Sequence, residues 1–166
     1  MKSMIVLMMM AVLACEDGKS VSPDPKLSDM VSLMGLKLTD AMVLRHMDGY
    51  NFAKPENFDE DPDVRNLFVN NFNHTVTYQF QKGILVNITL WIQPNGWQKL
   101  KFIGDIGNDI NRNDSPAVAS EKLKIIKLEK DNVGWVTIKS KLHGKGIWYN
   151  WDENAKLYSI QIVLND

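Results

Sequence analysis

The stretch His74–Ile92, HTVTYQFQKGILVNITLWI, decides the fold class of this chain. Apolar and polar residues alternate on both sides of Gln81-Lys82-Gly83, which is the pattern of two strands joined by a tight turn. Pro94-Asn95-Gly96 follows, and Asn-Gly readily supplies the positive φ that a primed hairpin turn requires. The sequence therefore predicts three sequential antiparallel strands, over residues 74–80, 84–92 and 97–103.

Two helices are predicted before these strands. In the first, Ser28 is the expected N-cap, Gly35 is the expected stop, and the apolar residues Leu27, Met30, Val31, Leu33 and Met34 recur at helical spacing. The second is expected to begin at the cap Thr39 and to end near Gly49. The polar stretch Phe52–Asn73 is predicted to be a loop.

The second half repeats this order in a shorter form. Ser115 and Pro116 predict the start of a helix over 116–123. Strands are then expected at 124–128, 133–142, 147–151 and 157–164. The order predicts an α+β fold of antiparallel β-meanders with short helices packed on one face. Residues 27–166 are expected to form one domain, either as two tandem helix-plus-meander units (27–103 and 104–166) or without a duplication.

The N-terminus has the features of a targeting signal. Met1–Ala14 has the form of a secretory signal peptide, with Lys2 before an apolar run that is shorter than the ~20 residues needed to span a bilayer. Val12-Leu13-Ala14-Cys15 resembles the bacterial lipobox, whose cysteine receives a lipid anchor. We therefore expect lipidation of Cys15 and attachment to the bacterial cell envelope, on its periplasmic face or at the cell surface. Simple secretion and an uncleaved segment are the alternatives.

Residues 15–26 are predicted to be a flexible tether, since they are polar and contain Pro23 and Pro25. Cys15 is the only cysteine, so the stability of the domain is expected to come from packing and not from disulfides. The formal net charge is -1, and the lysines are scattered without a basic stripe. A nucleic-acid partner is therefore not expected.

No catalytic pattern is present in the sequence. There is no nucleophile elbow, no phosphate-binding glycine loop and no pair of closely spaced histidines, so His46, His74 and His143 are interpreted as structural or surface residues. The carboxylates at 59, 61 and 63 resemble the start of a calcium loop, but the glycine and the glutamate of that loop are missing. We expect a protein that is not an enzyme and uses no metal or cofactor.

Aromatic residues are the remaining functional signal. The candidate partner-binding residues are Trp91, Trp97, Trp135, Trp148, Tyr149 and Trp151, all in predicted strands or beside turns. In the alternating pattern Trp148 and Asn150 share one face of their strand, while Tyr149 and Trp151 share the other. Because tryptophan and tyrosine dominate binding hot spots, one face of the sheet is expected to bind a protein partner. The alternative is a small apolar or carbohydrate ligand held between sheet and helices, lined by Met30, Met34 and Met47.

The segment Gly35-Leu36-Lys37-Leu38-Thr39-Asp40 resembles the start of the second helix in a known group of repeats. With the lipobox and the order of elements, it makes the chain similar to the small lipoprotein of the outer-membrane β-barrel assembly machinery. The doubled order resembles the tandem-repeat β-lactamase inhibitor proteins and, more loosely, immunity lipoproteins. This resemblance implies binding of another protein through the exposed sheet face, without chemistry, and it assigns no role to an individual residue.

Overall fold

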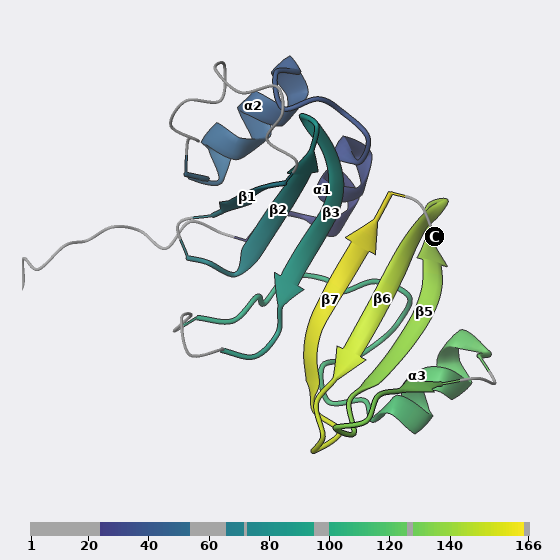
Figure 1. The fold of residues 1–166 in the computed structure, drawn as a ribbon. Coiled ribbons are helices and arrows are strands. Elements are labelled where there is room, and N and C mark those ends of the chain that lie inside the picture. The colour runs from purple at the N-terminus through teal and green to yellow at the C-terminus, as the bar shows by residue number, and fades with distance from the viewer. Residues whose placement is uncertain (1–23, 54–65, 72, 95–99, 126–127, 165–166) are drawn as a thin grey trace, which may run out of the picture.

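The computed structural model describes residues 24–53, 66–71, 73–94, 100–125 and 128–164 of the 166. A seven-stranded antiparallel sheet forms one layer, and the helices lie on one of its faces (Figure 1). This confirms the predicted α+β fold with meandering strands. The strands are β1 (Leu67–Asn70), β2 (Val76–Gln81), β3 (Ile84–Trp91), β4 (Glu129–Lys130), β5 (Val136–Leu142), β6 (Lys145–Trp151) and β7 (Leu157–Val163).

The strand order joins the two halves of the chain into one sheet. The order is β1-β2-β3-β7-β6-β5-β4, so the last strand of each half lies at the centre of the sheet. There β3 pairs antiparallel with β7, and Leu90 lies opposite Ile160. Both halves therefore contribute to one continuous hydrophobic core.

The helices differ from the sequence prediction mainly at their starts. α1 (Leu27–Leu33) begins one residue before Ser28 and has Lys26 at its N-cap; α2 (Ala41–Gly49) has Asp40, not Thr39, at its N-cap. The carboxylate of Asp40 instead accepts a hydrogen bond from the backbone amide of Lys37, which shapes the preceding turn. α3 (Pro116–Leu123) begins as predicted, since Ser115 caps it. None of the helices in the described ranges is long and apolar enough to cross a membrane.

The strands require three corrections. The strand expected at 124–128 is found later in the chain, as β4 at Glu129–Lys130. The predicted loop over residues 52–73 contains β1, which pairs with β2 and supplies the buried Val69 to the core. Of the predicted returning strand over residues 97–103, the described part from 100 onward is not a strand, although the Phe102 amide donates to the carbonyl of Trp91. Among the described residues the strands of the first half are therefore β1, β2 and β3, and the last of them ends at Trp91. The predicted Asn95-Gly96 turn lies outside the described residues.

The inner face of the sheet is buried under α1, α2 and the segment 100–115. Tyr78, Tyr149 and Trp151 have no exposed surface, and they pack with Met30 of α1 and Val43 of α2 in the core. Full burial of a side chain of this size stabilises a fold by roughly 1.5–3 kcal/mol. Polar tips on this face reach into the covering layer, where the Trp151 indole donates to the carbonyl of Asp114 at 2.8 Å.

Candidate functional site

The opposite face of the sheet, here called the open face, has no described helix over it. Strand register places its side chains in rows across the four central strands, with Thr77, Thr89, Gln161 and Trp148 in one of these rows. None of these side chains belongs to the hydrophobic core. The open face consists of Thr77, Gln79, Asn87, Thr89, Trp91, Trp148, Asn150, Ser159 and Gln161.

An aromatic row runs along one end of this face. The ring of Tyr158 contacts Trp91 edge-on at 5.8 Å and Trp135 edge-on at 5.0 Å, measured between ring centroids. Tyr158 reaches this face because a bulge in β7 leaves it without an opposite residue between Leu157 and Ser159. The aromatic row, Trp91–Tyr158–Trp135, is partly exposed and held by ring-to-ring contacts.

Polar side chains on the open face bond to one another and are thereby held in place. The Trp91 indole donates to the Thr77 hydroxyl at 2.9 Å, and that hydroxyl donates to Asn70 at 2.6 Å. In the other half, the Thr137 hydroxyl donates to the Asn150 side-chain oxygen at 2.9 Å. Side chains fixed in this way lose little entropy when a partner binds.

Trp148 lies between a cation and a shallow hollow. The Lys139 ammonium sits over its ring, 4.8 Å from the centroid, and is also paired with Glu129 at 3.0 Å. The hollow is about 340 Å³ in volume and lies over the junction of β3 and β7. It is lined by Gln79, Gln81, Val86, Asn87, Trp148, Gln161, Val163 and Leu164. The buried side-chain oxygen of Asn87 has no hydrogen-bond partner among the described residues.

The candidate residues from sequence divide between the two faces. Trp91 and Trp148 lie on the open face, and Trp135 joins it through Tyr158. Tyr149 and Trp151 are fully buried on the inner face, as the alternation predicted, so they belong to the core and not to the open face. Trp97 lies outside the described residues.

The predicted ligand space between sheet and helices is occupied by side chains. Met30, Met34 and Met47 are all buried members of the hydrophobic core. Two hollows formed by described residues are lined by other side chains, one on the open face and one at the ends of β3 and β7.

Gln161 and Val86 of the open face were not singled out from the sequence, and Tyr158 was noted only as one of the aromatic residues in predicted strands. Gln161 was simply one polar residue of an alternating strand, although its central position makes it a contact residue. Strict alternation groups Val86 with the buried Ile88 and Tyr158 with the buried Ile160, but each is the extra residue of a bulge. Only the partner strand reveals a bulge, so a single strand's alternation could not have found them.

His46 has a structural environment on the inner side. Its Nε2 lies 2.6 Å from the buried Tyr78 hydroxyl, and its ring stacks on Tyr78 and contacts Tyr50 at a tilt. Burial lowers the pKa of His46, partly offset by Asp29, while burial raises the pKa of the Tyr78 hydroxyl. Among the described residues no group of three or more His, Cys, Asp or Glu side chains is placed to hold a metal ion. The acidic cluster at 59–63 lies outside the described residues.

The fold and the open face define a class: an α+β domain with helices on one side of an antiparallel sheet and an aromatic, polar surface on the other. Comparisons with protein-family models, with curated proteins and with solved structures give no match for this chain. The open face is therefore the feature of this chain that bears on its function.

Proposed function

We propose that the protein is a membrane-tethered lipoprotein of the bacterial cell envelope that binds another protein through the open face, without catalysing a reaction. Its role is that of an inhibitor, an immunity factor or an assembly component, as the resemblance to such proteins implies. The observation that carries the proposal is the aromatic row Trp91–Tyr158–Trp135 beside Trp148 on a sheet face with no described helix over it.

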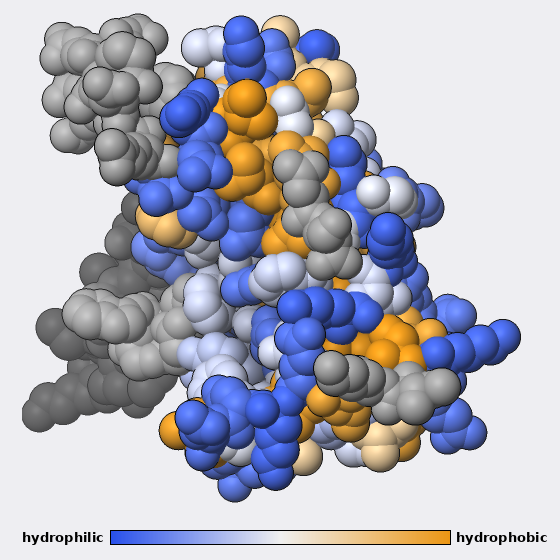
Figure 2. Space-filling model, turned by 45° about the vertical axis from the view of Figure 1, so that its right-hand side comes forward, coloured by the Kyte–Doolittle hydropathy of each residue, from blue (hydrophilic) through white to orange (hydrophobic). Residues whose placement is uncertain are grey.

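The composition of the open face supports a protein partner. Aromatic rings supply apolar contact area at low entropic cost, and the amides and hydroxyls between them can donate and accept hydrogen bonds. On the side of the molecule drawn in Figure 2, hydrophobic residues form separate patches divided by hydrophilic ones. The open face mixes aromatic rings with amides and hydroxyls, and a mixed surface is typical of partners that associate and separate, whereas obligate interfaces are more apolar.

The lipid anchor is the second part of the proposal. The predicted tether is described only from Asp24, whose carboxylate accepts bonds from the Thr75 hydroxyl at 2.7 Å and the Ile103 amide at 2.6 Å. These bonds fix Asp24 on the domain, so the part of the tether that can be flexible ends before it. The nine residues from Cys15 to Pro23 span at most roughly 30 Å when extended. Metabolic labelling with a fatty acid is expected to mark the protein and to leave Cys15→Ala unlabelled.

Site-specific photo-crosslinking in the source cells tests the proposed interface. A photoreactive residue at Gln161, the centre of the open face, is expected to form an adduct with one defined protein. The same residue at Glu121, exposed on α3, is the matched control and is expected to form no such adduct. Adding Trp91→Ala and Trp148→Ala should abolish the adduct at 161. An adduct at 161 that survives both changes would contradict binding through the aromatic surface.

A second candidate function, carbohydrate binding, is favoured by one specific feature. The hollow beside Trp148 is lined by four amide side chains, Gln79, Gln81, Asn87 and Gln161, and the Asn87 oxygen has no partner among the described residues. Amides both donate and accept, as sugar hydroxyls do, and an indole ring offers a flat apolar surface for the ring of a sugar. Titration with soluble envelope glycans separates the two functions. If the protein binds carbohydrate, glycans bind, Gln161→Ala weakens that binding, and the crosslink to a protein is absent.

A further inference from the structure

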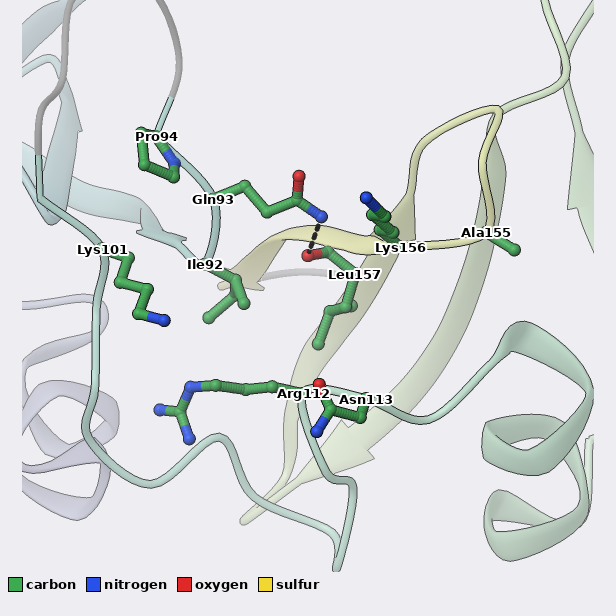
Figure 3. Close-up of a pocket in the computed structure, with 9 residues that line it drawn as sticks. All are labelled: Ile92, Gln93, Pro94, Lys101, Arg112, Asn113, Ala155, Lys156 and Leu157. Carbon is green, nitrogen blue, oxygen red and sulfur yellow. Dashed lines mark hydrogen bonds between the residues drawn. The ribbon is translucent and has the colours of Figure 1, made fainter.

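A second pocket lies at the junction of the two halves, at the end of the sheet where β3 stops and β7 starts. It has a volume of about 530 Å³, which is within the range of small-molecule sites. Two segments and three further side chains form this junction pocket (Figure 3). The segments are Ile92–Pro94 after β3 and Ala155–Leu157 at the start of β7, and the side chains are Lys101, Arg112 and Asn113. Backbone bonds hold the first two segments together, since the amides of Ile92 and Gln93 both donate to the carbonyl of Tyr158.

Three cations and no carboxylate line this pocket. Lys101 and Arg112 extend to the same side of it, and Lys156 lies on the other side, near Gln93 (Figure 3). None of the three forms an ion pair with a described residue. The neighbouring acids are already engaged: Asp114 pairs with Lys122 at 2.7 Å, and Asp152 accepts bonds from backbone amides of its own turn.

The Arg112 side chain is held in place, but not all of its hydrogen-bond donors have an acceptor among the described residues. One of its terminal nitrogens donates to the carbonyl of Gly104, which fixes the guanidinium. Its Nε is buried and has no hydrogen-bond partner among the described residues. A buried donor without a partner costs free energy. The terminal nitrogens of the guanidinium can donate to an oxyanion, and such charge-assisted bonds are among the stronger ones.

The rest of the pocket wall is apolar or neutral. Ile92 and Leu157 are almost fully buried beneath it, and the Gln93 amide is oriented by its bond to the carbonyl of Leu157 at 3.0 Å. A ligand that fits this wall carries its negative charge at one end and an apolar group at the other. Three positive charges match a doubly charged phosphate better than a singly charged carboxylate.

We propose that the junction pocket binds a phosphate monoester, with the phosphate at Lys101 and Arg112 and the organic part against Ile92 and Leu157. This proposal does not depend on the function assigned to the open face. The same chemistry occurs in a free phosphate monoester and in the headgroup of a phosphatidic acid, and the test includes a probe for each source.

Calorimetric titration of the purified protein with phenyl phosphate and with a short-chain, soluble phosphatidic acid tests the pocket. Short-chain phosphatidylcholine, which has no monoester, is the control ligand. Binding is expected for at least one monoester, and the tighter one identifies the source. Lys101→Gln and Arg112→Gln are each expected to weaken it about tenfold, the loss of one charge-assisted bond. Lys141→Gln, an exposed lysine on β5 away from the pocket, is the matched control and should bind as the unchanged protein does.

Two results would overturn the proposal. One is that neither monoester binds. The other is that binding is the same in Lys101→Gln, Arg112→Gln and Lys141→Gln, which would mean that net charge alone attracts the anion. Lys101 is exposed, so its variant should fold even if the Arg112 variant does not. Thermal unfolding checks the folding of each variant, and a ligand that binds the native state must also raise the melting temperature.

Discussion

Tyr78 and Tyr149 occupy corresponding positions in the two halves of the sheet. In each half the strand register shifts at a bulge just after the tyrosine. The shift falls between Gln79 and Phe80 after Tyr78, and between Asn150 and Trp151 after Tyr149. Each is fully buried, and each hydroxyl reaches the layer that covers its own half. Tyr78 meets His46 of α2, whereas Tyr149 donates to the carbonyls of Ile106 and Gly107 at 3.2 and 3.3 Å.

The bulges themselves correspond as well. The extra residue is Val86 in β3 and Tyr158 in β7, and these are the two strands that meet at the centre of the sheet. In both places the bulge turns an additional side chain toward the open face. The two halves thus share a local geometry, although their covering layers differ: two helices in the first half, and a loop with one helix in the second.

The different partners of the two tyrosines predict different costs for removing their hydroxyls. Tyr149→Phe removes the one hydroxyl proton that two backbone carbonyls share, and we expect a loss of about 1–2 kcal/mol in the free energy of unfolding. Tyr78→Phe leaves only the half-buried His46 without its partner, so the loss should be smaller. Urea denaturation of both variants measures the two values, and an equal cost would mean that the Tyr149 bonds add nothing.

His46 predicts a pH dependence of stability. Burial lowers its pKa in the folded protein, so the unfolded chain takes up a proton at a higher pH than the folded one. Stability should therefore fall as the pH drops from about 6.5, the unfolded pKa, to the folded pKa, and the loss should not grow below it. Above pH 7 this contribution should be fully present.

Thermal unfolding of the protein and of His46→Gln between pH 5 and 8, a range set by histidine titration, measures this effect. Glutamine can still bond to the Tyr78 hydroxyl, while Asp29, which acts on the pKa from α1, remains in both proteins. The difference between the two melting temperatures should change over this range in favour of the variant at low pH. A constant difference would show that His46 titrates normally in the fold.

The sequence was sufficient for those elements whose pattern is local. The strands β2, β3, β6 and β7 were predicted because alternation is visible within each one, and α3 because Ser115 and Pro116 mark its start. The strand β1 was missed, since it has only four residues and only one of them, Val69, is buried, which leaves too little alternation to see. The inward Tyr149 followed from alternation, whereas the outward Tyr158 depends on a bulge that exists only relative to β6.

Gly107 is expected to tolerate no side chain. Its φ is +77°, and an added Cβ would lie 2.9 Å from Leu27 and 3.3 Å from Leu142. Gly107→Ala should therefore cost about 1–3 kcal/mol, from backbone strain and crowding together.

Gly144 is the matched control, because its φ is +78° and nothing lies within 4 Å of its added Cβ. Gly144→Ala should cost only the backbone part, about 1 kcal/mol. Equal costs in chemical denaturation would show that the segment around Gly107 shifts to make room.

Trp148 and Trp151 test the division between the two faces within a single strand. Trp151 is fully buried and bonded to the carbonyl of Asp114, so Trp151→Ala should cost about 3–5 kcal/mol of stability. Trp148 is half-buried on the open face, and Trp148→Ala should cost less than about 1.5 kcal/mol, because little core contact is lost. Denaturation curves measure both values.

In the binding assay Trp148 should matter more than Trp151, which is the reverse of their order in stability. The photo-crosslink from position 161 is expected to disappear with Trp148→Ala, while Trp151→Phe, which retains most of the buried ring, should keep it as long as the protein is folded. A large stability loss for Trp148→Ala would mean that this tryptophan supports the fold, and the open face would then lose its central contact residue. Loss of the crosslink at unchanged stability would instead assign Trp148 to the partner interface.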